Sequence, residues 1–288
     1  MLSLVVMWGS AFMFNSLALQ SFSPAALVTT RLLIGAVVLA AVAIHFRVNW
    51  KAVNARLLGW FLAMAVVGNA LPFYLIAWGQ QYVSSSLAGI LMAVMPIATL
   101  LMAHFLLEGE PLTRRRIAGF LLGFAGIVIL MGPASLREMG GDDATTLLAQ
   151  IAILAAALCY ALGTIIARLR PESDDLLTST LVLGFATLIT LPFSLADGPP
   201  LTAPLNGVPL IATLFLGIVA TGLATVVYFI LLRRAGATFL ALINYLIPVW
   251  ALLAGVLFLH EAVTWPALIA LAVILAGIGV SQARWRFW

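Results

Sequence analysis

Apolar residues fill most of this chain in long runs, and short polar breaks separate the runs. Each run holds about 20 residues, the length that an α-helix needs to cross the hydrocarbon core of a bilayer. The breaks carry residues that begin or end helices, such as Ser23-Pro24, Gly132-Pro133 and Trp265-Pro266. The pattern predicts ten transmembrane helices, at 2–19, 25–45, 57–79, 84–106, 115–132, 145–168, 175–195, 207–231, 238–259 and 265–282.

The composition supports the same class of protein. Of the 288 residues, 64% are hydrophobic and only 8% are charged, which is too little charge for a soluble domain. The apolar runs are continuous rather than alternating, so a transmembrane β-barrel is excluded. The single cysteine, Cys159, falls inside a predicted helix, so neither an intramolecular disulfide nor a cysteine metal cluster is expected. We therefore expect an all-α polytopic membrane protein.

The two halves of the chain resemble each other. Residues 152 positions apart are often alike, as in Trp8 with Tyr160, Asn69 with Thr221 and Pro96 with Pro248. This predicts two repeats of five helices, at 1–132 and 144–282, joined by the loop 133–143. Because five is an odd number, the second repeat would be inverted relative to the first. Inverted repeats are typical of secondary transporters.

Positive charge falls on one side of the predicted membrane. Twelve of the 14 Lys and Arg residues lie in the loops after the second, fourth, sixth and eighth helices and in the C-terminal tail. The exceptions are Arg137, in a loop on the other side, and Arg31, inside the second helix. Cytoplasmic loops of membrane proteins are enriched in Lys and Arg, so both termini are predicted to be cytoplasmic. The net charge of +4 therefore reflects topology, and no nucleic-acid partner is expected.

Acidic residues avoid the predicted membrane interior. All ten Asp and Glu residues fall in loops or at helix ends, which argues against proton or sodium coupling through a carboxylate. A sodium site made of carbonyl and hydroxyl oxygens stays open. The only lysine, Lys51, follows no glycine-rich loop, and the hydrolase motifs His-Glu-x-x-His and Gly-x-Ser-x-Gly do not occur. Neither an enzyme nor a cofactor or metal site is expected.

Polar and aromatic side chains inside the predicted helices fall on common faces, and such groups are costly to expose to lipid. We interpret them as the lining of a substrate cavity, in which amides would bind polar groups and rings would supply apolar surface. The alternative is that they serve helix packing and interhelical hydrogen bonds. The candidate cavity residues are Trp8, Asn15, Asn69, Tyr74, Trp78, Gln80, Gln81, Tyr82, Tyr160, Tyr228, Asn244 and Trp250.

Two prolines lie at matching places in the repeats. Pro96 and Pro248 each remove a helical hydrogen bond at mid-membrane, so they are candidates for hinges, with static kinks as the alternative. Arg31 either extends to the membrane surface or pairs with Glu261, or else it attracts a substrate carboxylate. Gly119-x-x-x-Gly123 is expected to be a packing face.

Several of these motifs together resemble a known family. The EamA-type members of the drug/metabolite transporter superfamily are matched by Trp8-Gly9-Ser10, the stretch from Pro96 to Gly109-Glu110, its echo from Pro248 to Glu261, and Gly126 with Gly277. The likeness covers nearly the whole chain and is greatest to the YddG-type amino-acid exporters. One departure is His260, where a glycine is expected before Glu261. The resemblance implies ten helices, with the fifth and tenth peripheral, and export across a bacterial inner membrane.

These observations lead to one functional hypothesis. We expect a secondary transporter that exports small metabolites, mainly amino acids with aromatic or large apolar side chains, by alternating access of a cavity between the repeats. The alternatives are export of other neutral or cationic metabolites or drugs, and a sensor or scaffold without transport. The expected partners are a small-molecule substrate and the lipid bilayer. A monomer is the working expectation, with the oligomeric state left open.

Overall fold

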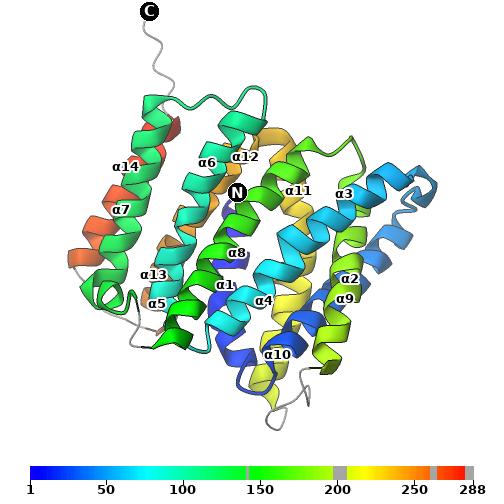
Figure 1. Cartoon of the computed structure of the whole chain (residues 1–288), viewed down its shortest axis with the longest axis horizontal. Coiled ribbons are helices and arrows are strands. Elements are labelled where there is room, and N and C mark those ends of the chain that lie inside the picture. The colour runs from blue at the N-terminus through cyan, green and yellow to red at the C-terminus, as the bar shows by residue number, and fades with distance from the viewer. Residues whose placement is uncertain (141–142, 197–205, 260–264, 283–288) are drawn as a thin grey trace, which may run out of the picture.

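A computed structural model describes residues 1–140, 143–196, 206–259 and 265–282, and in these stretches the chain is helical (Figure 1). Within these stretches, eight helical segments are long and apolar enough to cross a membrane. Two further apolar helical segments, Leu2–Ala18 and Ala237–Trp250, are shorter. The eight segments are Pro24–His45, Ala55–Gly79, Leu87–Leu106, Arg114–Arg137, Ala144–Leu169, Asp175–Ala196, Gly207–Ala235 and Trp265–Gln282.

Several predicted segments consist of more than one element. The elements in chain order are α1 (Leu2–Ala18), α2 (Pro24–His45), η1 (Trp50–Ala52), α3 (Ala55–Ala65), η2 (Val66–Ala70), α4 (Leu71–Gly79), α5 (Ser85–Met92), α6 (Val94–Leu106), α7 (Arg114–Arg137), α8 (Ala144–Leu169), α9 (Asp175–Ala196), α10 (Gly207–Phe215), η3 (Leu216–Leu223), α11 (Ala224–Ala235), α12 (Ala237–Ala241), α13 (Ile243–Leu259) and α14 (Trp265–Gln282).

The structure confirms a helical membrane-type fold with eight apolar spans among the described residues. The count of ten spans, the inversion of the second half and the cytoplasmic termini stay predictions. Glu261 and the tail arginines Arg284 and Arg286 lie outside the described residues.

Polar side chains begin the helices where the sequence predicts breaks. Ser23 accepts a hydrogen bond from the backbone N–H of Ala26, and Pro24 occupies the first position of α2. Asn54 and Asp143 cap α3 and α8 in the same way. Each cap satisfies an N–H group that has no partner within its helix. At Gly132 the φ of 77° is not helical, so α7 is kinked where its apolar run was predicted to end.

Two π-helical segments widen the helices near the middle of the chain's two halves. The 152-residue offset carries residues 66–70 of η2 onto 218–222, which lie inside η3. In η2, the side chain of Asn69 donates to the carbonyl oxygen of Met64 at 3.2 Å. In η3, the carbonyl oxygen of Ala220 accepts from the indole Nε1 of Trp8 at 3.2 Å. Such segments occur often at functional sites, and here they place backbone and side-chain polar groups deep in the bundle.

The helices that carry the two matching prolines are both interrupted. The helix of Pro96 breaks at Ala93, between α5 and α6, and that of Pro248 breaks at Leu242, between α12 and α13. Proline lacks the N–H that would bond the carbonyl four residues earlier. For Pro96 that carbonyl belongs to Met92, beside the break at Ala93. For Pro248 it belongs to Asn244, two residues after the break at Leu242. Whether these breaks move during transport stays a prediction.

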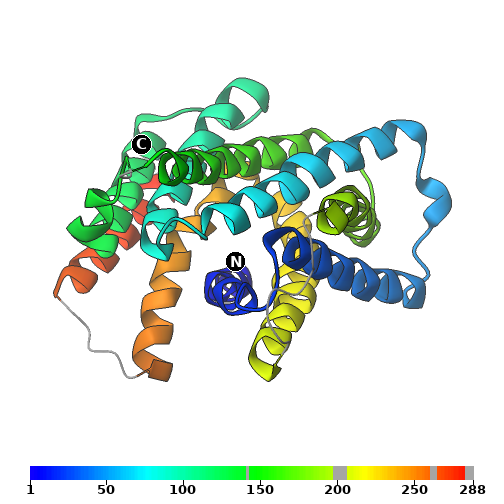
Figure 2. The same cartoon turned by 60° about the horizontal axis from the view of Figure 1, so that its bottom comes forward.

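The helices spread from one edge of the molecule to the other in Figures 1 and 2. The pair α7 and α14 lies at one edge, the pair α2 and α9 lies at the opposite edge, and α1, α8 and α11 run between them. The arrangement places the fifth and tenth predicted helices together, away from the middle.

Glycine allows α7 and α14 to approach closely. A Cβ atom on Gly277 would lie 2.6 Å from the carbonyl oxygen of Gly119 and 2.7 Å from the backbone nitrogen of Gly123. The predicted packing face therefore meets the backbone of α14 directly.

We expect Gly277→Ala to destabilise the protein by about 1–3 kcal/mol, because the added methyl group overpacks a backbone contact that cannot yield. The matched control is Gly279→Ala on the same helix, where a Cβ would meet nothing within 4 Å. Thermal unfolding of both purified variants in one detergent measures the difference. Equal melting temperatures for the two variants would contradict the close approach.

Candidate functional site

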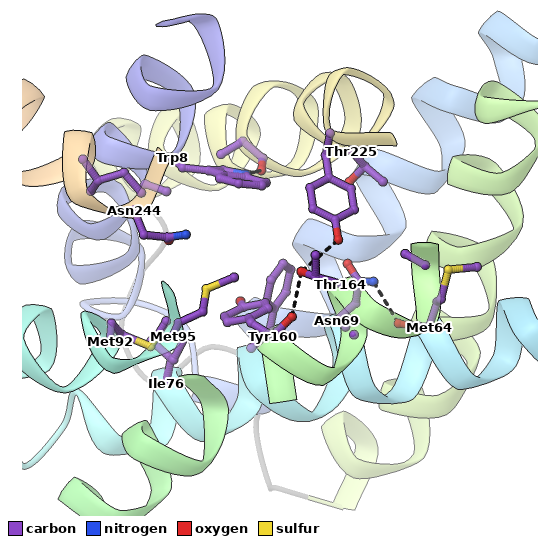
Figure 3. Close-up of a pocket in the computed structure, with 18 of the residues that line it drawn as sticks. Trp8, Met64, Asn69, Ile76, Met92, Met95, Tyr160, Thr164, Thr225 and Asn244 are labelled. Atoms are coloured by element: carbon purple, nitrogen blue, oxygen red, sulfur yellow. Dashed lines mark hydrogen bonds between the residues drawn. The ribbon is translucent and has the colours of Figure 1, made fainter. Parts of the chain in front are cut away.

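A cavity of about 170 Å³ lies in the middle of the bundle, between elements of both halves of the chain (Figure 3). Trp8 and Asn244 lie on one side of it, and Tyr160, Met92 and Met95 lie on the other. Its other lining residues are Ala11, Asn15, Arg31, Met64, Gly68, Asn69, Phe73, Ile76, Gln80, Gly163, Thr164, Ala167, Ala220, Thr225, Tyr228, Phe229 and Ile247.

Seven of the twelve predicted cavity residues line this space: Trp8, Asn15, Asn69, Gln80, Tyr160, Tyr228 and Asn244. Hydrogen bonds join four of them to elements far away in the sequence, one being the bond from Trp8 to Ala220. Asn15 donates to Gln80 at 2.7 Å, and Tyr228 donates to Thr164 at 3.1 Å. The lining polar groups are therefore held in fixed positions by neighbouring elements. Their contact with a substrate stays a prediction.

The lining amides of Asn69 and Asn244 keep free acceptors. The Nδ2 groups of Asn69 and Asn244 donate to backbone carbonyls of Met64 and Ala241, at 3.2 Å each. Their Oδ1 atoms accept no hydrogen bond from the described residues. Both oxygens thus remain available to a donor such as an ammonium group.

Aromatic rings enclose the cavity in pairs from different elements. Trp8 and Tyr228 have ring centroids 6.0 Å apart, and Phe73 packs edge-on to Tyr160 at 6.2 Å. Such rings supply a large, rigid apolar surface. In the part of the chain that the structure describes, His, Cys, Asp and Glu residues do not gather in groups of three that would hold a metal ion.

Five predicted residues do not line the cavity. Tyr82 is 47% exposed, its ring packs 5.4 Å from that of Trp78, and Tyr74 and Gln81 are exposed. Trp250 packs on α1 instead, where its Nε1 donates to Ser10 Oγ at 3.0 Å. A Cβ on Gly9 would lie 2.6 Å from the Trp250 ring, so the missing side chain of Gly9 makes room for the indole.

Sequence reasoning did not assign the apolar part of the lining. Met64, Met95, Phe229 and Ile247 face the cavity, yet each stands within an apolar run that looks the same on every face. No polar or periodic signal distinguishes them from residues that face lipid.

A second, more polar cavity of about 550 Å³ adjoins the loop between α8 and α9. Ala167 lines both cavities, so the two cavities approach each other at this residue. Beside it, the buried carboxylate of Asp175 pairs with Arg170 at 2.9 Å and with Arg233 at 2.7 Å. These ion pairs join the ends of α8 and α11 to the start of α9.

The model of the EamA-like transporter family matches residues 1–132 and 147–281. The chain belongs to this family. Similar EamA-like relatives include "Uncharacterized transporter YoaV" of Bacillus subtilis, 25% identical over 280 residues that cover 96% of this chain and 93% of the relative. The "Probable amino-acid metabolite efflux pump" of Escherichia coli is 25% identical over 296 residues, covering 99% of this chain and 95% of the pump.

A solved crystal structure shares the fold of this EamA-like chain. It has a TM-score of 0.80 and 20% sequence identity, and the match covers 98% of this chain and 95% of the other. The family assignment confirms a polytopic membrane transporter, as the sequence predicted.

Proposed function

We propose that the protein exports amino acids with aromatic or large apolar side chains across the cell inner membrane, in the manner of the YddG-type exporters. The observation that carries the proposal is the central cavity, which combines amide groups with paired aromatic rings. Amides would bind the polar end of an amino acid, while the rings would pack against its side chain.

The size of the cavity supports a compact substrate. Its volume of about 170 Å³ is below the roughly 300–1,000 Å³ that is usual for pockets that hold drug-sized ligands. Its only charged lining residue among those described is Arg31, and a fixed positive charge disfavours cationic drugs. Both facts favour an amino acid over the alternative substrates.

The proposed mechanism is alternating access between the two repeats, at 1–132 and 144–282. In the predicted topology, Asn15 and Gln80 lie towards the outer face, and their hydrogen bond would close that end of the cavity. The second cavity beside Ala167 would then be a cytoplasmic vestibule through which the substrate enters. Bending near Pro96 and Pro248 would alternate which end is open.

The E. coli relative supports the substrate class, since its name describes amino-acid metabolite efflux. Proton coupling is not part of the proposal. No carboxylate lines the described cavity, and His104, in the last turn of α6, is exposed and accepts a hydrogen bond from the backbone N–H of Leu112 at 3.1 Å.

We expect purified protein in liposomes to exchange aromatic and large aliphatic amino acids by counterflow, at rates that do not change when a pH gradient is imposed. The panel should include small, acidic and basic amino acids, a nucleoside and a cationic dye. Exchange of none of these compounds would contradict a carrier, and exchange of the dye alone would contradict the substrate class. Strong stimulation by the gradient would contradict a mechanism without proton coupling.

A further inference from the structure

Arg31 is held inside the cavity by three elements. It lies two turns into α2 and is only 8% exposed. Its Nε donates to Thr221 Oγ1 of η3 at 3.1 Å, and its guanidinium carbon lies 4.3 Å from the centre of the Phe73 ring of α4. These contacts hold the side chain within the bundle, which does not fit the predicted alternative that it extends to the membrane surface.

Close helix packing fixes this position. A Cβ on Gly35 of α2 would lie 3.1 Å from the carbonyl oxygen of Gly217 in η3, and one on Gly217 would lie 2.6 Å from Ile34. The backbones of α2 and η3 therefore meet one turn from Arg31. The guanidinium is consequently placed by packing as well as by its own hydrogen bond.

The guanidinium has no acidic partner in the described part of the chain. The acidic groups there that form ion pairs are Glu110, which pairs with Arg116, and Asp175, which pairs with Arg170 and Arg233. Glu261, the partner predicted as one alternative, lies outside the described residues. The Nη1 and Nη2 atoms of Arg31 donate to no described residue. An unpaired charge at this depth is costly, so a partner of opposite charge is expected from elsewhere.

We propose that Arg31 binds the carboxylate of the transported substrate. The two free Nη groups carry four N–H donors in a plane, which match the two oxygens of a carboxylate. Phe73 and Thr221 orient this fork by holding its face and its Nε. The inference rests on the proposed function, because it names the chemical group by which the substrate is recognised.

The surroundings favour a substrate with a single carboxylate. Arg31 is the only cationic residue among the described residues that line the cavity. One arginine balances one carboxylate, whereas a phosphate ester with two negative charges requires further cations. The Oδ1 atoms of Asn69 and Asn244 would accept from the ammonium group of a zwitterion.

The test uses four compounds with one phenyl ring in common. L-Phenylalanine and 3-phenylpropionate carry a carboxylate, whereas L-phenylalaninamide and 2-phenylethylamine do not. Binding to the purified full chain is measured by the shift of the thermal unfolding temperature, and exchange is measured by competition in counterflow. We expect the two carboxylates to bind at least about tenfold more tightly than the amide or the amine, because only a carboxylate can accept charge-assisted hydrogen bonds from both Nη groups.

The variants separate recognition from folding. Arg31→Gln should bind all four compounds alike, while Arg31→Lys should keep a weaker preference because it retains the charge and loses the fork. Thr221→Val keeps the charge and removes the acceptor of Nε, so the preference should fall a few-fold. The charge-matched control is Arg137→Gln, which changes an exposed residue outside the cavity and should keep the wild-type preference.

The outcomes test two claims separately: that Arg31 binds the carboxylate, and that the protein transports amino acids. If Arg31→Gln exchanges amino acids and keeps the preference for carboxylates, Arg31 is not the carboxylate site, although the transport function stands. If no amino acid is exchanged but binding of 3-phenylpropionate depends on Arg31, the amino-acid function fails and the carboxylate site stands. Failure of both carboxylates to bind the wild-type protein overturns the site and the proposed function together.

Discussion

Replacement of Gly163 by alanine is expected to reduce transport about tenfold, although Gly163 carries no side chain that touches a substrate. Gly163 lies in α8 and lines the cavity, and a Cβ on it would lie 2.9 Å from the Cα of Gly68 in η2. The contact joins the two family-matched regions of the chain backbone to backbone. An overpacked contact costs about 1–3 kcal/mol, and every 1.4 kcal/mol changes an equilibrium about tenfold. A carrier that loses that much of one conformation is slowed by a similar factor.

The matched control is Gly68→Ala, on the other side of the same contact. Its Cβ would have only the Cα of Gly163 as a neighbour, at 4.0 Å, so the added methyl group fits and transport should be retained. Initial rates of counterflow, normalised to the amount of reconstituted protein, provide the comparison. Equal rates for the wild type and Gly163→Ala would show that this contact does not limit transport, and an equal loss in both variants would point to general sensitivity of the helices instead.

The positions of the helices followed from the sequence because each depends on local signals. Apolar runs of sufficient length predict the spans, and Ser23-Pro24 marks the start of α2 by the physics of capping alone. The cavity residues that could be predicted are those for which lipid exposure would be costly, such as Asn15, Asn69 and Asn244.

The remaining site residues depend on geometry that the sequence does not display. In the third predicted helix, η2 adds a wider turn before α4 and so changes which side chains of α4 face inward. Phe73, which was not among the candidate residues, lines the cavity beside the candidate Gln80, whereas the candidate Tyr74 is exposed and Trp78 packs beside Tyr82.

Long-range contacts explain the other differences between the predicted and the observed positions of the site residues. Trp250 packs on Gly9 and Ser10, which lie about 240 positions earlier in the chain. That pairing depends on how α13 crosses α1, and no local pattern in the sequence predicts it. The same holds for Arg31, whose partners Phe73 and Thr221 come from two other elements, so its environment became clear only in the folded chain.

Replacement of Asp175 by asparagine is expected to destabilise the protein by about 3–5 kcal/mol, the usual cost of removing one member of a buried ion pair. The side chains of Asp175 and Arg170 are 6% and 8% exposed, and the guanidinium also lies 5.0 Å from the centre of the Phe229 ring. Burial lowers the pKa of Arg170, and the Asp175 carboxylate opposes that shift. Without the carboxylate, the buried cation loses the neighbour that stabilises its charged form, while asparagine preserves the shape of the site.

Two nearby variants test this assignment, with thermal unfolding in detergent as the measurement. Arg233 pairs with the same carboxylate but is 55% exposed, so Arg233→Ala should cost no more than about 1 kcal/mol. Glu172 is exposed in the same loop, and Glu172→Ala should leave the melting temperature unchanged. Because Phe229 and Ala167 line the central cavity beside this cluster, Asp175→Asn should also slow transport. A melting temperature for Asp175→Asn equal to that of Glu172→Ala would show that the ion pair does not hold α8, α9 and α11 together.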